Sequence, residues 1–179
     1  MSEEAGHVAH IFVAARRAAP MVALAKVEAL EASGLEGDRY TQVASRFSRH
    51  YQVTLIELEA IEAFRQETGL ALTPEMPRRN IVTRGVRLNG LIGRRFRIGA
   101  ALFEGAELCE PCGLFAKRTH REVLKTLAGR GGLRAKVIKG GAIRPGDAIR
   151  VEDLVNFPPR EESHLRAFAH EINHPSEGT

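Results

Sequence analysis

Two cysteines offer the most distinctive chemistry in this 179-residue sequence. Cys109 and Cys112 are the only cysteines, and Glu110 and Pro111 separate them. A structural zinc site would need four nitrogen or sulfur ligands, and the sequence has no second Cys-x-x-Cys pair. A thioredoxin-like dithiol would follow the first strand of a βαβ unit near the chain start, whereas this pair lies past the middle. The pair is then either two buried thiols without a chemical task or the location of a reactive thiolate.

Positive charge surrounds the second cysteine. Lys117 and Arg118 follow Cys112 closely, and a helix is expected after them. Cationic neighbours and a helix start stabilise a thiolate, which can attack or carry sulfur or ligate a soft metal. Residues 78–150 contain 17 Lys and Arg against five Asp and Glu, a net charge of +12 compared with +4 for the whole chain. The segment suits a phosphate-bearing ligand, although a solvated surface would show the same excess.

Two further motifs contain residue types that bind anions or form tight turns. Arg78, Arg79 and Asn80 stand at the entry to an expected strand. Guanidinium groups bind phosphate through paired hydrogen bonds, and an Asn amide both donates and accepts. In segment 34–40, two glycines allow a sharp turn and Asp38 can accept hydrogen bonds from nearby backbone amides. Each motif taken alone is also consistent with a structural role.

The elements that must position these residues are mostly short strands. Apolar runs broken by Gly, Pro and Asn predict strands at 7–14, 21–30, 53–56, 80–83, 94–98, 101–106, 133–139 and 148–151. Helical spacing predicts one helix from 58 that ends at Gly69, and another over 119–127. Pro145 and Gly146 fit the two central positions of a type II turn.

Size and composition place the chain among soluble globular domains. Its residues are 44% hydrophobic and 27% charged, and a chain of this length needs no metal or disulfide to hold its core. No apolar run approaches the roughly 20 residues that cross a bilayer, and the start does not read as an export signal. We therefore expect a cytoplasmic protein that does not associate with a membrane.

Taken in order, the motifs resemble the MOSC family, the domain named after the C-terminal part of molybdenum cofactor sulfurases. The segments that carry the resemblance are GLEGDRY, VTLIELEAIEAF, PRRNIVTRGVRLNGLIGRRFRIGAALFEGAELCEPC and GGLRAKVIKGGAIRPGDAIRVED. The resemblance implies an α/β, β-rich fold, a mixed barrel of MOSC type similar to the pyruvate-kinase β-barrel, with a few peripheral helices. It also implies a MOSC-like domain over 1–153, leaving 154–179 as a C-terminal tail whose composition predicts a peripheral helix.

The resemblance further implies a functional cysteine and a basic pocket for a molybdopterin-type molybdenum cofactor. The family's cysteine corresponds to Cys112, as the catalytic thiol or the metal ligand, and Cys109 is its candidate partner. The family's Arg-x-Asn-Ile-Val motif corresponds to residues that begin with Arg78 and Asn80, which would contact the pterin phosphate or ring.

The resemblance also implies that charged side chains help to bind the cofactor. Asp38 and Arg39 match the family's Gly-Asp-Arg motif, and Arg39, Lys117 and Arg118 would make the site attractive to anions. Stand-alone members often continue this motif with His, whereas this chain has Tyr40. The resemblance therefore implies no acid or base role at position 40.

Two functions are compatible with these residues. As a sulfur carrier, Cys112 would take sulfur from a persulfide donor such as a cysteine desulfurase, and Cys109 could release it by forming a disulfide. As a reductase of N-hydroxylated compounds, the thiolate would ligate molybdenum, with electrons from an electron-transfer protein. No pyridoxal-phosphate desulfurase domain is recognisable, so no PLP is expected. The extra N-terminal β-barrel domain of amidoxime-reducing relatives is also missing, which makes independent reductase activity less secure.

A nucleic-acid-binding module is the alternative from another class. The positively charged segment and the run Arg94-Arg95-Phe96-Arg97 motivate it. However, aromatic residues make up only 6% of the chain and do not alternate with the basic ones, as a base-stacking surface requires. We therefore expect a small anionic ligand rather than nucleic acid.

Overall fold

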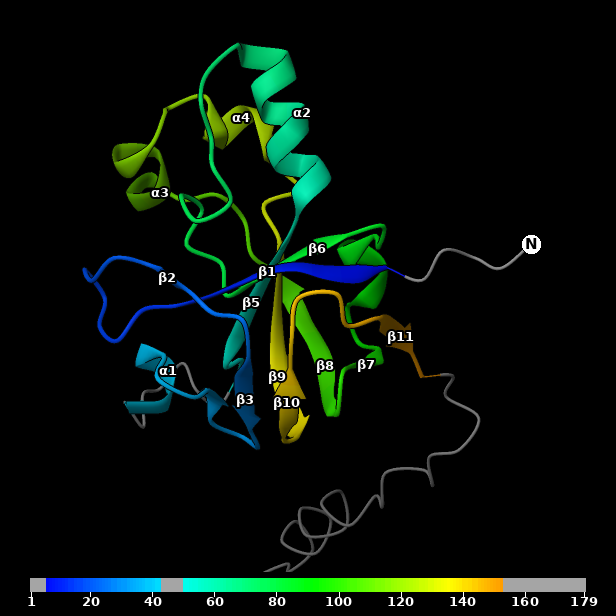
Figure 1. Cartoon of the computed structure of the whole chain (residues 1–179). Coiled ribbons are helices and arrows are strands. Elements are labelled where there is room, and N and C mark those ends of the chain that lie inside the picture. The colour runs from blue at the N-terminus through cyan, green and yellow to red at the C-terminus, as the bar shows by residue number, and fades with distance from the viewer. Residues whose placement is uncertain (1–5, 43–49, 153–179) are drawn as a thin grey trace, which may run out of the picture.

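The computed structural model describes residues 6–42 and 50–152. They form a curled half-barrel sheet with a small second sheet beside it (Figure 1). The predicted C-terminal tail, 154–179, lies outside the described residues.

The large sheet has eight strands. Their order is β11 (Ile149–Val151), β7 (Arg95–Ile98), β8 (Ala101–Leu108), β9 (Leu133–Lys139), β5 (Val53–Glu57), β6 (Ile81–Arg84), β1 (His7–Val13) and β2 (Val22–Ala23). The second sheet has the order β10 (Gly141–Ile143), β3 (Val27–Leu30) and β4 (Gly34–Leu35). Only β5 and β6 pair in parallel among the described strands, so the sheet is mixed.

Backbone hydrogen bonds join the two ends of the large sheet. The Val8 amide donates to the Asp147 carbonyl at 3.0 Å, and the Ile149 amide donates to the Gly6 carbonyl at 2.6 Å. These contacts bring β1 against the segment that leads into β11, although the two strands lie near opposite ends of the strand order. The expected β-rich, mixed sheet is thereby confirmed.

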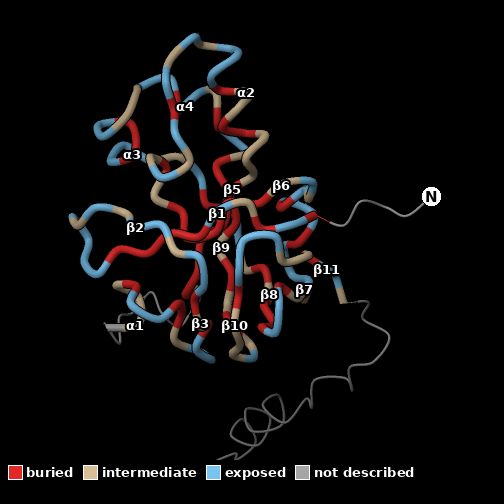
Figure 2. Tube along the Cα trace, viewed as in Figure 1, coloured by how far each residue is buried: buried red, intermediate tan, exposed pale blue. Residues whose placement is uncertain are grey.

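Alternation along the central strands divides their side chains between two apolar clusters. In β5, Leu55 belongs to the cluster inside the curl, whereas Ile56 belongs to the cluster under the helices. Ile81 and Val82 of β6 divide in the same way. Because consecutive side chains of a strand point to opposite faces, both faces of this parallel pair must be apolar. Figure 2 shows the central strands buried and the outer loops exposed.

The helices lie together on one side of the sheet (Figure 1). They are α2 (Leu58–Thr68), α3 (Gly113–Arg118) and α4 (Val123–Thr126), while α1 (Arg39–Gln42) and the 3₁₀ helix η1 (Leu88–Leu91) lie elsewhere. As predicted, α2 ends at Gly69, which has a φ of 71°. None of the described helices is long and apolar enough to span a membrane.

The boundaries predicted for one helix, 119–127, and one strand, 21–30, are wrong. A single helix is predicted over 119–127, but α3 begins directly after Cys112 and ends at Arg118, and the next residue, Thr119, has φ and ψ of −131° and −100°. Thr119 leaves the helical region, so only the short α4 remains of the predicted helix. The strand expected over 21–30 is divided into β2 and β3, and β10 was not predicted.

Gly132 makes a close backbone contact that the fold requires. Its φ is 122°, and a Cβ there would lie 2.1 Å from the Leu55 carbonyl oxygen. We expect Gly132→Ala to lower the free energy of unfolding by about 2–5 kcal/mol, because it adds backbone strain to a clash with backbone. Chemical denaturation of the purified variant measures this. Gly90→Ala is the matched control, since nothing lies within 4 Å of its Cβ, and equal stability of the two variants would contradict the account.

Candidate functional site

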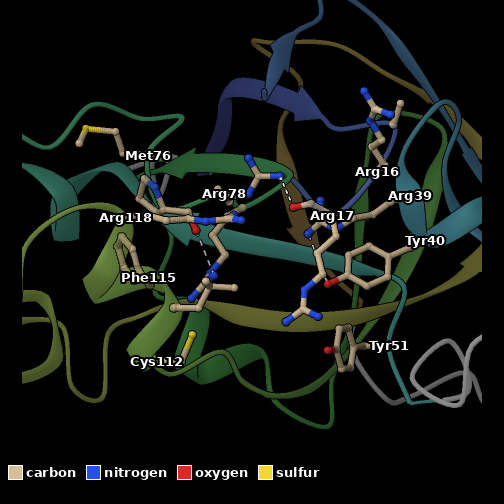
Figure 3. Close-up of a pocket in the computed structure, with 14 residues that line it drawn as sticks. Arg16, Arg17, Arg39, Tyr40, Tyr51, Met76, Arg78, Cys112, Phe115 and Arg118 are labelled. Carbon is tan, nitrogen blue, oxygen red and sulfur yellow. Dashed lines mark hydrogen bonds between the residues drawn. The ribbon is translucent and has the colours of Figure 1, made fainter. Parts of the chain in front are cut away.

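A cavity of about 640 Å³ opens beside the second cysteine (Figure 3). Its only charged lining residues among those described are six arginines: Arg16, Arg17, Arg39, Arg78, Arg79 and Arg118. The rest of the lining is apolar or aromatic, apart from Cys112. The cavity therefore presents positive charge and a thiol to whatever enters it.

Cys112 lies at the junction between β8 and α3. Its side chain is exposed and lines the cavity, and its carbonyl accepts a hydrogen bond from the Ala116 amide at 3.0 Å. Cys109 is also a free thiol, but it is only 4% exposed and does not line the cavity. The two cysteines thus occupy different environments, and only Cys112 is accessible to a ligand.

Arg79 holds the loop that carries the cysteines. Its guanidinium donates to the carbonyls of Cys109 at 2.9 Å, Gly131 at 3.1 Å and Pro77 at 3.1 Å. Glu110 adds a second tie, because its carboxylate accepts the Gly129 amide at 2.9 Å. Arg79 is 9% exposed and makes no ion pair with any described acidic residue. Buried charges are normally paired, so this guanidinium favours an anion in the cavity.

Asp38 and Asn80 meet in a buried hydrogen-bond network below the cavity. Asn80 Nδ2 donates to Asp38 Oδ2 at 3.0 Å and to the Phe12 carbonyl at 3.2 Å, while its Oδ1 accepts from Thr54 Oγ1 at 3.0 Å. Asp38 Oδ2 also accepts the Ala14 amide at 3.0 Å. Neither side chain is among the cavity lining. The expectation that Asn80 touches a pterin needs correction, because its amide is fully used inside the protein.

Arg39 extends from this network into the cavity. Its Nη1 lies 3.7 Å from Asp38 Oδ2, and its guanidinium lies over the Tyr40 ring, 4.6 Å from the centroid. Nη1 is buried and makes no hydrogen bond within the described part of the chain. Asp38 therefore positions Arg39 rather than contacting a ligand itself.

Arg78 lies between two other arginines. Burial and the neighbouring charges of Arg39 and Arg118 lower the pKa of Arg78 below its ordinary value. Burial is the larger cause, and repulsion from the neighbouring guanidinium groups adds to it, because like charges disfavour the charged form. Arg118 lines the cavity as expected, whereas Lys117 is exposed and does not line it.

Several lining residues were not identified from the sequence. Arg16 and Arg17 come from a loop before β2, and Tyr51 comes from the segment just before β5. Adjacent arginines at 16 and 17 were visible in the sequence, but only the fold brings them to the cysteine. Figure 3 shows Cys112 and Arg118 on one side of the cavity and Arg16 and Tyr51 on the other.

The Asp38–Asn80 contact gives a stability prediction. Asn80→Asp would place a second carboxylate against Asp38 and remove a hydrogen-bond donor, so we expect a loss of about 3–5 kcal/mol in unfolding free energy. Thermal and chemical denaturation measure it. Gln66→Glu, the same chemical change at an exposed position of α2, should cost under about 0.5 kcal/mol. Similar costs for the two variants would show that the network is not important.

Tyr51 gives a prediction about pH. Burial, followed by the neighbouring Tyr40, raises the pKa of the Tyr51 phenol above 10.0. Unfolded tyrosine deprotonates near pH 10, so the folded protein binds more protons there and loses stability as pH rises. Phenolate absorbance should therefore show a step for Tyr51 at a pH above that of free tyrosine. Tyr51→Phe should remove that late step, and its persistence in this variant would contradict the assignment.

Comparison with known proteins agrees with this geometry. The structure is similar to that of the YuaD protein from Bacillus subtilis, with a TM-score of 0.69 and 18% identity over 82% of this chain and 95% of that one. YiiM from Geobacillus stearothermophilus has a TM-score of 0.64 and 16% identity over 83% of this chain and 75% of that one. YiiM from Escherichia coli gives 0.62 and 17% over 83% and 71%. These likenesses show the fold.

The sequence itself identifies the family. No curated protein matches the chain, but the family model described as the MOSC domain matches residues 42–150. This match covers more than half of the sequence, including the cysteine pair and the strand entry at Arg78. The chain belongs to the MOSC domain family.

Proposed function

We propose that the cavity binds a molybdenum or tungsten pterin cofactor, or accepts sulfur destined for one, through the thiolate of Cys112. The observation that carries the proposal is an exposed thiol in a cavity whose charged lining, in the described residues, consists of arginines. Thiolates are ligands for soft metals and nucleophiles toward sulfur. Arginines suit the phosphate of a pterin cofactor, because their planar donors can bind its oxygens through paired hydrogen bonds.

The described residues fit such a cofactor. Phe115 and Met76 give the cavity an apolar wall for a flat heterocycle, and Arg39 and Arg118 offer guanidinium groups for its phosphate. Arg79, which has no carboxylate partner among the described residues, brings a buried positive charge to the loop that carries the thiol. When bound, the group would supply oxidation–reduction chemistry at its metal. The chain's own residues would hold it, exclude water and keep Cys112 accessible.

As a carrier, Cys112 would act as a nucleophile toward a persulfide. Its thiolate attacks the outer sulfur of the donor, an S–S bond forms on Cys112, and the donor leaves as a thiolate. The exposure of Cys112 allows a donor protein to approach. Disulfide formation with Cys109 would require the buried Cys109 thiol to move, so the proposal rests on Cys112 alone.

The same thiol would serve the catalytic alternative, a reductase of N-hydroxylated compounds that receives electrons from a partner protein. The cavity volume of about 640 Å³ lies within the range of small-molecule and cofactor pockets, which is compatible with this alternative. In this version Cys112 holds the metal and the arginines hold the cofactor's phosphate.

Ion pairs argue against the nucleic-acid alternative. In β7, Arg95 pairs with Glu104 at 3.4 Å and Arg97 pairs with Glu152. Two of the arginines that suggested nucleic-acid binding are therefore already paired with carboxylates of the protein. Phosphate-backbone binding depends on cations that are free to release counterions.

One experiment separates the two versions. The protein is purified from a host that makes the cofactor, and its metal, its pterin and the mass of the peptide that contains Cys112 are measured. Metal with pterin supports ligation, and an added sulfur atom without metal supports the carrier. Cys112→Ala should abolish either signal, whereas Cys109→Ala should keep at least about half of it. The absence of metal, pterin and added sulfur from the wild-type protein would contradict the proposed function.

A further inference from the structure

The short helices α3 and α4 each bury one side in the apolar cluster under the helices. This cluster receives Phe115 and Ala116 from α3, and Val123 and Leu127 from the start and the C-cap of α4. The two helices also contact each other (Figure 1). Because side chains three or four residues apart share one side of a helix, the residues between these buried positions face away from the cluster.

The outward side of each helix carries an exposed leucine within about one turn of two cations. Leu114 is 41% exposed and Leu124 is 43% exposed. Single exposed leucines are common on protein surfaces, but here the same combination occurs twice in neighbouring helices. We call the exposed residues that form it the α3–α4 face: Leu114, Lys117, Arg118, Arg121, Leu124 and Lys125.

The four cations of the α3–α4 face form no ion pair with any described acidic residue. By contrast, Arg84, Arg97 and Arg134 each pair with a glutamate. Segment 113–125 contains these four cations and one acidic residue, Glu122, which gives a net charge of +3. The face therefore attracts acidic groups from outside the described part of the chain.

The α3–α4 face borders the cavity without closing it. Two of its members, Leu114 and Arg118, also line the cavity, and the other four do not. α3 begins directly after Cys112. A protein bound to the face would lie next to the thiol and leave the opposite rim, at Arg16 and Tyr51, open to a small substrate (Figure 3).

This position favours an electron carrier over a persulfide donor as the partner. Persulfide transfer requires the donor's sulfur to touch the Cys112 sulfur, so such a donor must cover the mouth of the cavity. Reduction of an N–OH group to N–H and water consumes two electrons and two protons. A carrier bound beside the cavity can supply the electrons while the substrate enters from the open rim and the protons come from solvent.

The composition of the face also suits an electron carrier. Complexes of electron carriers are small and weak, and complementary charge guides their association. Two exposed leucines among four cations provide a small apolar contact area with charge around it, as such an interface requires.

We propose that the α3–α4 face is the docking surface for an acidic electron-transfer protein, whose carboxylates meet the four cations and whose apolar centre covers Leu114 and Leu124. The inference rests on the reductase version of the proposed function and specifies its partner.

Charge reversal on the face tests the proposal, with an acidic ferredoxin of the plant type as the probe. Arg121→Glu with Lys125→Glu changes two cations that do not line the cavity. Arg94→Glu with Lys139→Glu is the matched control, because it changes the net charge equally at exposed positions next to β7 and in β9. At low salt we expect the face variant to weaken binding at least about tenfold, and the control about threefold or less. Equal weakening in both variants, or no binding by the wild-type protein, would overturn the docking surface.

The apolar part of the face has its own test. Leu124→Ala should weaken binding of the ferredoxin about threefold to fivefold, because it removes apolar area from the contact. Leu30→Ala, at a leucine of β3 that is 40% exposed, should leave binding unchanged. Equal effects of the two substitutions would contradict the assignment.

Two further measurements separate the possible failures. A single-stranded oligonucleotide that binds as tightly as the ferredoxin, and is lost in the same face variant, would make the face a nucleic-acid site and overturn the proposal. Metal and pterin are measured in the same preparations. Protein that holds both, but binds ferredoxin equally before and after charge reversal, would overturn the docking surface and leave the proposed function standing. The absence of metal and pterin would overturn the reductase version and this inference together.

Discussion

The buried hydrogen bond between Asp38 and Asn80 joins three separate parts of the chain. Asp38 follows β4, Asn80 precedes β6, and both also bind the backbone at the end of β1. Arg39 is the next residue after Asp38, and Arg78 and Arg79 directly precede Asn80. One amide–carboxylate contact at 3.0 Å therefore places three of the cavity's guanidinium groups. Polar groups that are fully satisfied inside a protein fix one arrangement, and here they fix the cation framework.

Positive charge and an accessible sulfur follow from that framework. The Arg79 guanidinium donates hydrogen bonds to the carbonyls of Gly131 and Cys109. These bonds tie the segment before β6 to the loop that carries the cysteines. Cys112 stays exposed because the loop is held through its backbone and through Cys109 and Glu110. Buried groups such as Asp38, Asn80 and Cys109 hold the structure together. The Cys112 thiol, which is exposed, remains available to a ligand. This accessibility is the physical reason for assigning chemistry to Cys112.

Local patterns predicted most strands and the end of α2 at Gly69, whereas the choice of Cys112 over Cys109 came from the family resemblance. Local patterns failed where tertiary contacts decide. Thr119 interrupts a helix that its apolar spacing favours, and Asn80 reads as a ligand contact although its amide is fully bonded inside the protein. Arg16 and Arg17 lie about 60 residues before Arg78 in sequence, and only the carbonyl contacts made by Arg78 reveal their place. No local spacing encodes such a long-range contact.

The central claim is that the Cys112 thiol lies in an accessible cavity of positive potential. The most direct measurement compares alkylation of Cys112 by iodoacetate, which is anionic, and by iodoacetamide, which is neutral, at one pH in the Cys109→Ala protein. We expect the ratio of the two rates to exceed that of free cysteine by about tenfold at low salt and to fall with ionic strength. A ratio equal to that of free cysteine, or below it, would contradict the account.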